Sequence, residues 1–215
     1  MTSRFGRGLY GMLDISASAP LLTPRSLYEP LFAAGVSVLQ LRMKDAGAAA
    51  MLAVLGELMA QKPSSCAVVV NDRLDVALAG GADGVHLGQD DLPLSAARAL
   101  CDVQGRRDLL IGISTHNETQ AAAAIAGGAD YIAVGPIFAT SSKRNPDPEV
   151  GVERLAQICQ SSPVPVIAIG GITLPRVPYI VAAGAHGAAI IAAVNQAADV
   201  LTAARHVQEA FGQNR

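Results

Sequence analysis

The sequence has no tryptophan, and aromatic residues make up only 4% of its 215 positions. Proteins that bind single-stranded nucleic acid use aromatic side chains as stacking platforms, and this chain has few to offer. The formal net charge of −2 gives no basic excess that would attract a polyanionic strand. We therefore expect no nucleic-acid partner.

Cysteine is also scarce, with three residues that lie far apart in the chain: Cys66, Cys101 and Cys159. An odd number of scattered cysteines without a CxxC pair predicts neither a disulfide framework nor a cysteine metal site. We expect them to be small buried hydrophobic residues in a reducing cytosol.

Long apolar runs are missing as well. The most apolar stretch, IVAAGAHGAAIIAAV, is interrupted by two glycines and a histidine and is too short to cross a membrane. Asp14 interrupts the apolar residues near the N-terminus, so we expect no signal peptide. These features predict a cytoplasmic protein without a membrane partner.

The sequence does contain short apolar runs that alternate with longer stretches rich in alanine and leucine. Nearly continuous apolar runs are typical of strands buried on both faces of a parallel sheet. We expect about eight strands, at 8–15, 36–42, 67–71, 84–87, 109–114, 131–134, 164–169 and 188–192. This count predicts an α/β fold, a (β/α)8 TIM barrel that forms a single domain over residues 1–215.

The alternative, a doubly wound sheet, normally has fewer strands and often a glycine-rich fingerprint after the first of them. Here LDISASAP follows the first strand, with no GxGxxG. The segments AAGVSV, GGADGV, GGADYI and AAGAHGA repeat one type of joint, in which a helix end and a glycine lead into a strand. A string of αβ units is therefore favoured.

The stretch SVLQLRMKD combines an apolar strand pattern with polar residues at every second position, Gln40, Arg42 and Lys44. Alternate side chains of a strand point to opposite faces, so these three share one face. A ligand that compensates two positive charges is the functional explanation. The structural explanation for Gln40 and Arg42 is that polar residues simply fill the barrel interior in layers.

In such barrels the chemistry lies at the carboxyl ends of the strands. The expected strand ends carry cations (Arg42, Lys44, Lys143), carboxylates (Asp72, Asp90, Asp91), and hydroxyls and glycines (Ser114, Thr140, Ser142, Gly170, Gly171). Cations together with carboxylates suggest a Mg²⁺-pyrophosphate, because Mg²⁺ binds a few carboxylates plus substrate oxygens. A second phosphate site is expected after the seventh and eighth strands.

Several of these residues have structural alternatives. Asp72 could cap the following helix, and we expect one of Asp90 and Asp91 to cap the helix that begins near Pro93. His86 and His116 could be hydrogen-bonded structural histidines or acid–base groups. The concurrence of polar groups at consecutive strand ends favours the functional interpretation.

The motifs QLRMK, NDR, DGVHLGQDD, GIST, VGPIFATSSK and AIGGI occur in this order over nearly the whole chain. Together they closely resemble the thiamine-phosphate synthase family. The resemblance implies a transferase of thiamine biosynthesis that joins hydroxymethylpyrimidine pyrophosphate to a (carboxy)thiazole phosphate and releases pyrophosphate. It also implies a (β/α)8 barrel, Mg²⁺ as cofactor and small-molecule substrates, and it is compatible with a homodimer.

Carried over residue by residue, the resemblance assigns three groups of contacts. Pyrophosphate contacts fall on Gln40, Arg42, Lys44, Asn71 and Lys143, with Ser114 near the pyrimidine pyrophosphate. Mg²⁺ ligands fall on Asp72 and Asp91, and thiazole phosphate contacts on Thr140, Ser142, Gly171, Ile191 and Ala192. The residues expected to act on the reacting groups are Arg42, Lys44, Lys143 and Ser114.

Two positions depart from the family pattern. Ala192 stands where members usually have serine, which removes a hydroxyl from the thiazole phosphate site, and Ser142 stands where threonine is common. Two other functions compete with the synthase. A thiazole tautomerase of the same family would not need a pyrophosphate cradle, and a non-catalytic phosphate-ligand sensor could lack the carboxylates.

Overall fold

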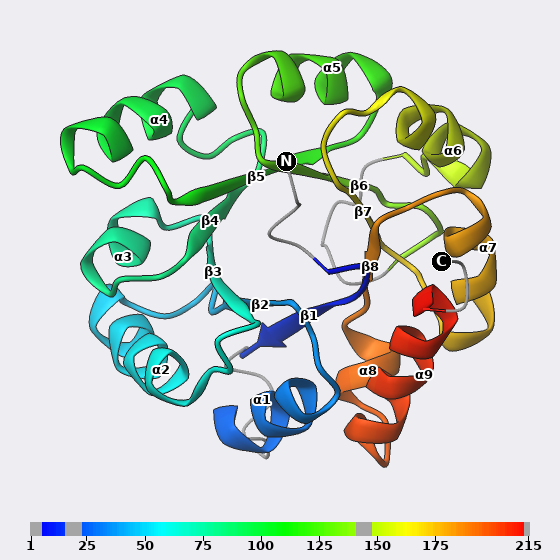
Figure 1. The fold of residues 1–215 in the computed structure, drawn as a ribbon, viewed down its shortest axis with the longest axis horizontal. Coiled ribbons are helices and arrows are strands. Elements are labelled where there is room, and N and C mark those ends of the chain that lie inside the picture. The colour runs from blue at the N-terminus through cyan, green and yellow to red at the C-terminus, as the bar shows by residue number, and fades with distance from the viewer. Residues whose placement is uncertain (1–5, 16–22, 141–147, 213–215) are drawn as a thin grey trace.

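The computed structural model describes residues 6–15, 23–140 and 148–212. Eight parallel strands pair in chain order, and the first strand pairs with both the second and the eighth. The helices surround this closed barrel (Figure 1). The predicted (β/α)8 barrel is thus confirmed, and the doubly wound alternative is excluded because an open sheet leaves two strand edges unpaired.

The strands are β1 (Gly8–Asp14), β2 (Val38–Arg42), β3 (Ala67–Asn71), β4 (Gly84–Leu87), β5 (Leu110–Thr115), β6 (Tyr131–Val134), β7 (Val166–Ile169) and β8 (Gly187–Ala189). The helices are α1 (Pro24–Ala33), α2 (Ala48–Gln61), α3 (Leu74–Ala79), α4 (Leu94–Val103), α5 (Glu118–Ala126), α6 (Gly151–Ser161), the 3-10 helix η1 (Leu174–Arg176), α7 (Val177–Ala182), α8 (Ala192–Asn195) and α9 (Val200–Gly212).

The first seven strands lie within two residues of their predicted bounds, but the last one does not. The predicted strand 188–192 was wrong at its end, because β8 stops at Ala189 and Ala192 already begins α8. The cause is the composition of this run. A short apolar run of alanine and isoleucine fits a strand and a helix equally well. The spacing of its apolar residues therefore cannot show which of the two forms.

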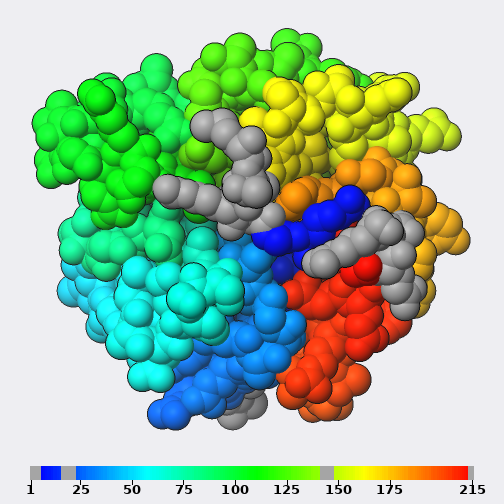
Figure 2. All heavy atoms as spheres, viewed as in Figure 1, coloured from blue at the N-terminus to red at the C-terminus, as the bar shows by residue number. Residues whose placement is uncertain are grey.

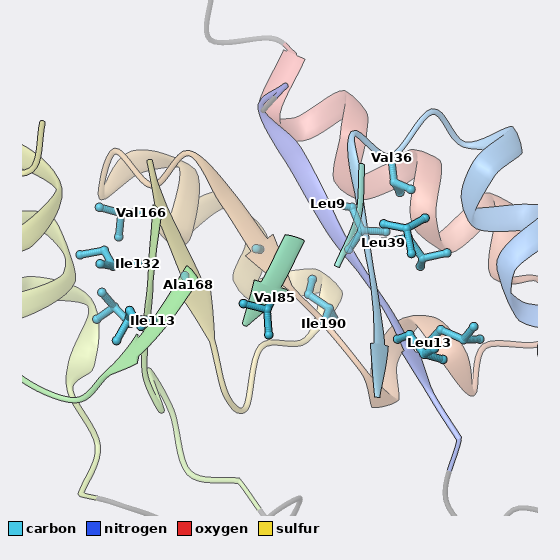
Figure 3. Close-up of a cluster of buried hydrophobic side chains, with 14 of the residues drawn as sticks. Leu9, Leu13, Val36, Leu39, Val85, Ile113, Ile132, Val166, Ala168 and Ile190 are labelled. Atoms are coloured by element: carbon cyan, nitrogen blue, oxygen red, sulfur yellow. The ribbon is translucent and has the colours of Figure 1, made fainter. Parts of the chain in front are cut away.

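Alternation along the strands divides the core into two layers. Outward side chains such as Leu9, Leu39 and Ile132 belong to a large cluster of buried residues between the strands and the helices (Figure 3). The C-terminal helix α9 contacts α1 and β1, and it lies beside α1 in the space-filling view (Figure 2). Helix α9 therefore packs on β1, the strand that closes the barrel by pairing with β8.

Inward side chains form a second, smaller cluster around Tyr10 and Tyr131. The rings of these tyrosines lie 5.8 Å apart across the barrel. Gly112 faces them, and a Cβ atom there would come within 2.0 Å of the Tyr131 ring. The missing side chain in β5 therefore makes room for a large ring from β6.

The repeated glycine joints have the predicted role. Their glycines have φ angles from +69° to +86°, a conformation that suits glycine: Gly35, Gly81, Gly128 and Gly184. In the two GAD joints, Asp83 accepts the N–H of Val68 and Asp130 accepts the N–H of Ile111, each at 2.7 Å. These aspartates are structural, and each ties one strand start to its neighbour.

Among the described residues, none of the helices combines the length and apolar character that a bilayer crossing needs.

Candidate active site

A cavity of about 710 Å³ lies inside the barrel toward the carboxyl ends of the strands, and each of the eight strands contributes to its lining. This volume is in the range of small-molecule binding sites. The predicted site residues that line it are Gln40, Arg42, Lys44, Asn71, Asp72, Asp91, Ser114, Thr140, Gly171, Ile191 and Ala192. Two predicted residues, Ser142 and Lys143, lie outside the described residues.

The cavity floor is a chain of hydrogen bonds that begins on β2 and β3. The Tyr10 hydroxyl donates to Gln40 Oε1 at 2.8 Å, and Gln40 Nε2 donates to Asn71 Oδ1 at 2.5 Å. Tyr10 also shares a 2.7 Å hydrogen bond with the Tyr131 hydroxyl on β6. Both amides are thus held in one orientation by partners inside the barrel.

The same chain continues through His86 of β4. Its Nδ1 lies 3.0 Å from the Tyr131 hydroxyl and its Nε2 lies 2.9 Å from Ser114 Oγ. Burial lowers the pKa of His86 to about 4, so the imidazole is neutral at pH 7. Both ring nitrogens have partners, which fits a hydrogen-bonded histidine that orients Ser114.

His116 also lines the cavity, and its Nδ1 donates to the carbonyl of Gly135. Its backbone N–H donates to Gln120 Oε1 at 2.7 Å. These contacts fix the turn between β5 and α5.

Arg42 has a protein partner that sequence reasoning did not assign. Arg42 Nη1 lies 2.7 Å from each carboxylate oxygen of Asp14, its partner in register on β1. Both side chains are mostly buried, with 18% and 17% exposed. The positive charge on this face of β2 is therefore compensated in part by the protein itself, and Lys44 at the rim is the more exposed cation.

Two carboxylates face each other beside these cations. Burial, the nearby charge of Asp91 and a hydrogen bond with Asp91 raise the pKa of Asp72 to about 6, although Lys44 and Arg42 act in the opposite direction. Asp72 has a φ of +64°, in the left-handed region that aspartate and asparagine tolerate better than most residues. The turn thus holds the carboxylate of Asp72 next to that of Asp91.

The predicted helix-capping alternatives for the acidic residues are wrong. Arg73 is the N-cap residue of α3 and Pro93 that of α4, and neither helix has a side-chain cap. The Asp91 carboxylate instead accepts the Gly88 N–H at 2.7 Å. Because proline occupies the cap position before α4, both acidic residues of QDD remain at the cavity.

Two close carboxylates fit a hard divalent cation, because its charge would remove their repulsion. Within the described part of the chain, no group of three or more acidic, histidine or cysteine side chains could hold a metal alone. A site of two carboxylates needs further oxygen ligands. Mg²⁺ commonly takes these from substrate phosphates and water.

The opposite wall of the cavity is formed by backbone. Gly170 and Gly171 follow β7 with φ angles of +95° and +64°. A Cβ on Gly171 would lie 2.4 Å from the Ala139 carbonyl oxygen, and one on Gly170 would lie 2.6 Å from Pro136. Glycine is therefore required here by both conformation and space, as the segment after β6 packs onto the turn.

Sequence reasoning missed several residues of the site. Among them, the hydroxyls of Tyr10 and Tyr131 belong to the hydrogen-bonded floor, and Arg176 lines the cavity beside the glycine turn. The pairing of Tyr10 with Val38 shows that strand register, which no local pattern specifies, places Tyr10 on the inward face. No periodic signal marks Arg176, which ends the short helix η1.

A parallel barrel with paired carboxylates, cations and a glycine turn on one cavity belongs to the class of barrel enzymes that act on phosphorylated small molecules. The chain matches the family described as thiamine monophosphate synthase over residues 22–194, and it belongs to that family.

Relatives and a solved structure agree with this assignment. The chain is 47% identical to a thiamine-phosphate synthase from Anaeromyxobacter dehalogenans, over 84% of this chain and 80% of that protein. It is 41% identical to one from Myxococcus xanthus, over 97% and 94%. The structure of a thiamine phosphate pyrophosphorylase from Pyrococcus furiosus superposes with a TM-score of 0.82 at 29% identity, covering 98% of this chain and 97% of that one.

Proposed function

We propose that this protein joins hydroxymethylpyrimidine pyrophosphate to thiazole phosphate, giving thiamine phosphate and pyrophosphate. Its relatives are named thiamine-phosphate synthase, which favours the synthase over the tautomerase. The observation that carries the proposal is the convergence of Arg42, Lys44, Asp72 and Asp91 on one cavity wall. A proton-transfer enzyme has no need of such a cradle for a diphosphate.

The chemical task follows from the substrates. The bond between the pyrimidine methylene carbon and the pyrophosphate oxygen breaks, and its electron pair leaves with pyrophosphate. The aminopyrimidine delocalises the positive charge on that carbon, and the lone pair of the thiazole nitrogen forms the new C–N bond. No protein nucleophile is needed, so the protein must stabilise the leaving group and align the two rings.

Each part of the cavity has a role in this scheme. Lys44 and Arg42 compensate the charge that grows on the leaving pyrophosphate, and Asp14 keeps the guanidinium of Arg42 in place. Gln40, Asn71 and Ser114 are held by the hydrogen-bonded floor and can contact the pyrimidine pyrophosphate. Lys143 and Ser142 keep the roles that the resemblance implies.

Asp72 and Asp91 would hold Mg²⁺, which supplies positive charge against the diphosphate when bound. Their mutual repulsion is the structural observation that fits a cation between them. Thr140, Gly171, Ile191 and Ala192 line the other side of the cavity, where the thiazole phosphate would bind.

The proposal is tested by mixing the protein with Mg²⁺ and both substrates and measuring thiamine phosphate and pyrophosphate together. Equal amounts of the two products are expected, and chelation of Mg²⁺ should stop their formation. Isomerised thiazole without pyrophosphate would instead indicate a tautomerase. Ligand binding by calorimetry without any turnover would indicate a sensor.

A further inference from the structure

Arg176 lines the cavity and has no role in the scheme above. It ends η1, six residues after the glycine turn begins at Gly170, and its side chain is half-buried. It therefore lies on the wall of the cavity opposite the carboxylates Asp72 and Asp91.

Two contacts hold its guanidinium in place. Arg176 Nη1 donates to the Gly171 carbonyl at 2.6 Å, and the guanidinium carbon lies 4.3 Å from the centre of the Phe138 ring. An arginine that is stacked on a ring and bonded to backbone loses little further freedom when it binds a ligand. Arg176 is thus positioned before any ligand arrives.

The charge of Arg176 has no carboxylate partner among the described residues, because none of the ion pairs found there includes it. Arg42, the other arginine of the cavity, is paired with Asp14. One bond to Gly171 leaves most of the five N–H donors of the guanidinium for a ligand. A half-buried, oriented guanidinium that pairs with no carboxylate in the described part of the chain is suited to binding an anion.

Barrels of this type commonly bind a phosphate group in the region after the seventh and eighth strands. On that side of the cavity, Ala192 presents a methyl group and offers no side-chain donor. Among the described residues of this wall, Arg176 supplies the positive charge. Its planar guanidinium can donate two parallel hydrogen bonds to the oxygens of a phosphate monoester.

We propose that Arg176 binds the phosphate of the thiazole substrate and supplies the polar contact that Ala192 cannot make. This inference rests on the proposed function, because it assigns a residue to one of the two substrates. Arg176 is accordingly a specificity-determining residue for a phosphorylated acceptor.

The test compares Arg176→Gln with the wild-type protein on two acceptors, the thiazole phosphate and the same thiazole alcohol without phosphate. Loss of a charge-assisted contact should raise the KM for thiazole phosphate about 10- to 100-fold. The kcat/KM for the alcohol and the KM for pyrimidine pyrophosphate should change less than about threefold. Equal losses on both acceptors would mean that Arg176 only supports the glycine turn, and unchanged KM values would also overturn the inference.

A second substitution sharpens the result. Ala192→Ser should restore part of the lost affinity for thiazole phosphate in the Arg176→Gln protein and should have a smaller effect in the wild type. Equal gains in both backgrounds would show that the two positions act independently, against the inference.

If the wild type makes no thiamine phosphate, the proposed function itself fails. If it does and Arg176→Gln behaves like it, only this inference fails.

Discussion

The two walls of the cavity differ in how they meet a charged ligand. The wall after β2, β3 and β4 uses side chains, with Lys44, Asp72 and Asp91 at the rim. The wall after β6 and β7 uses backbone, where Gly170 and Gly171 are packed against the segment that follows β6. Side chains at a rim can be changed without changing the fold, whereas a backbone wall is part of the fold.

The first prediction tests the side-chain wall. Lys44→Ala should lower kcat/KM about 100- to 1000-fold, because a charge that stabilises the leaving group is worth about 3–4 kcal/mol in the transition state. The side chain is exposed, so the free energy of unfolding should change by less than about 0.5 kcal/mol. Steady-state kinetics and urea unfolding provide the two measurements.

Lys62→Ala is the matched control for this change. Lys62 follows α2 and interacts with the Cys66 carbonyl and with Asp83, away from the cavity lining. Its removal should leave kcat/KM nearly unchanged. If Lys44→Ala also kept full activity, the rim cation would have no part in catalysis.

The second prediction tests the backbone wall. Gly171→Ala should destabilise the protein by about 2–4 kcal/mol, because alanine is strained at a φ of +64° and its Cβ would clash with the carbonyls of Ala139 and Phe138. Urea unfolding measures this loss. Activity should fall along with stability, in contrast to Lys44→Ala.

Gly56→Ala provides the comparison for glycine. Gly56 lies within α2, and a Cβ there would meet no atom within 4 Å. Alanine should stabilise that helix by about 0.5–1 kcal/mol. A similar gain at Gly171 would show that the glycine turn does not need its left-handed backbone.

Features that depend on local sequence could be predicted. The apolar pattern of each strand and the polar residues at the strand ends are local signals. They predicted the barrel and placed Gln40, Arg42, Asp72 and Asp91 among the site residues. The ion pair between Arg42 and Asp14 depends on the register of β1 against β2, which no local pattern specifies.

The remaining misses also have a spatial cause. The Tyr10–Tyr131 hydrogen bond spans 121 positions of the chain and exists only because the barrel closes. Arg176 depends on the packing of Phe138 against a turn from another strand. Contacts of this kind follow from tertiary structure, and composition and periodicity do not encode them.

Repulsion between Asp72 and Asp91 in the side-chain wall makes the stability of the protein depend on pH. The folded-state pKa of Asp72 is raised to about 6, above the usual value of 3.8. Between pH 3.8 and about 6, Asp72 is therefore protonated in the folded protein and ionised in the unfolded chain. The stability that this proton contributes is lost as the pH rises through 6. At pH 7 the charged carboxylate opposes folding, mainly because it is partly buried next to Asp91.

Asp72→Asn should remove this penalty and raise the free energy of unfolding by about 1–2 kcal/mol at pH 7, after allowance for solvent screening. Asparagine also tolerates the φ of +64°, so the backbone need not change. The gain should fade as the pH falls toward 4, where the wild-type carboxyl is protonated in the folded state. Urea unfolding at several pH values measures it.

Asp75→Asn is the control with the opposite sign, because a hydrogen bond from Arg73 lowers the pKa of Asp75. That change should give a small loss of stability at pH 7, in place of a gain. Activity of Asp72→Asn should fall at the same time as its stability rises, since the repulsion that costs stability is what a cation between the carboxylates would relieve. A variant that lost stability at pH 7 would show that Asp72 is already compensated by Lys44 and Arg42.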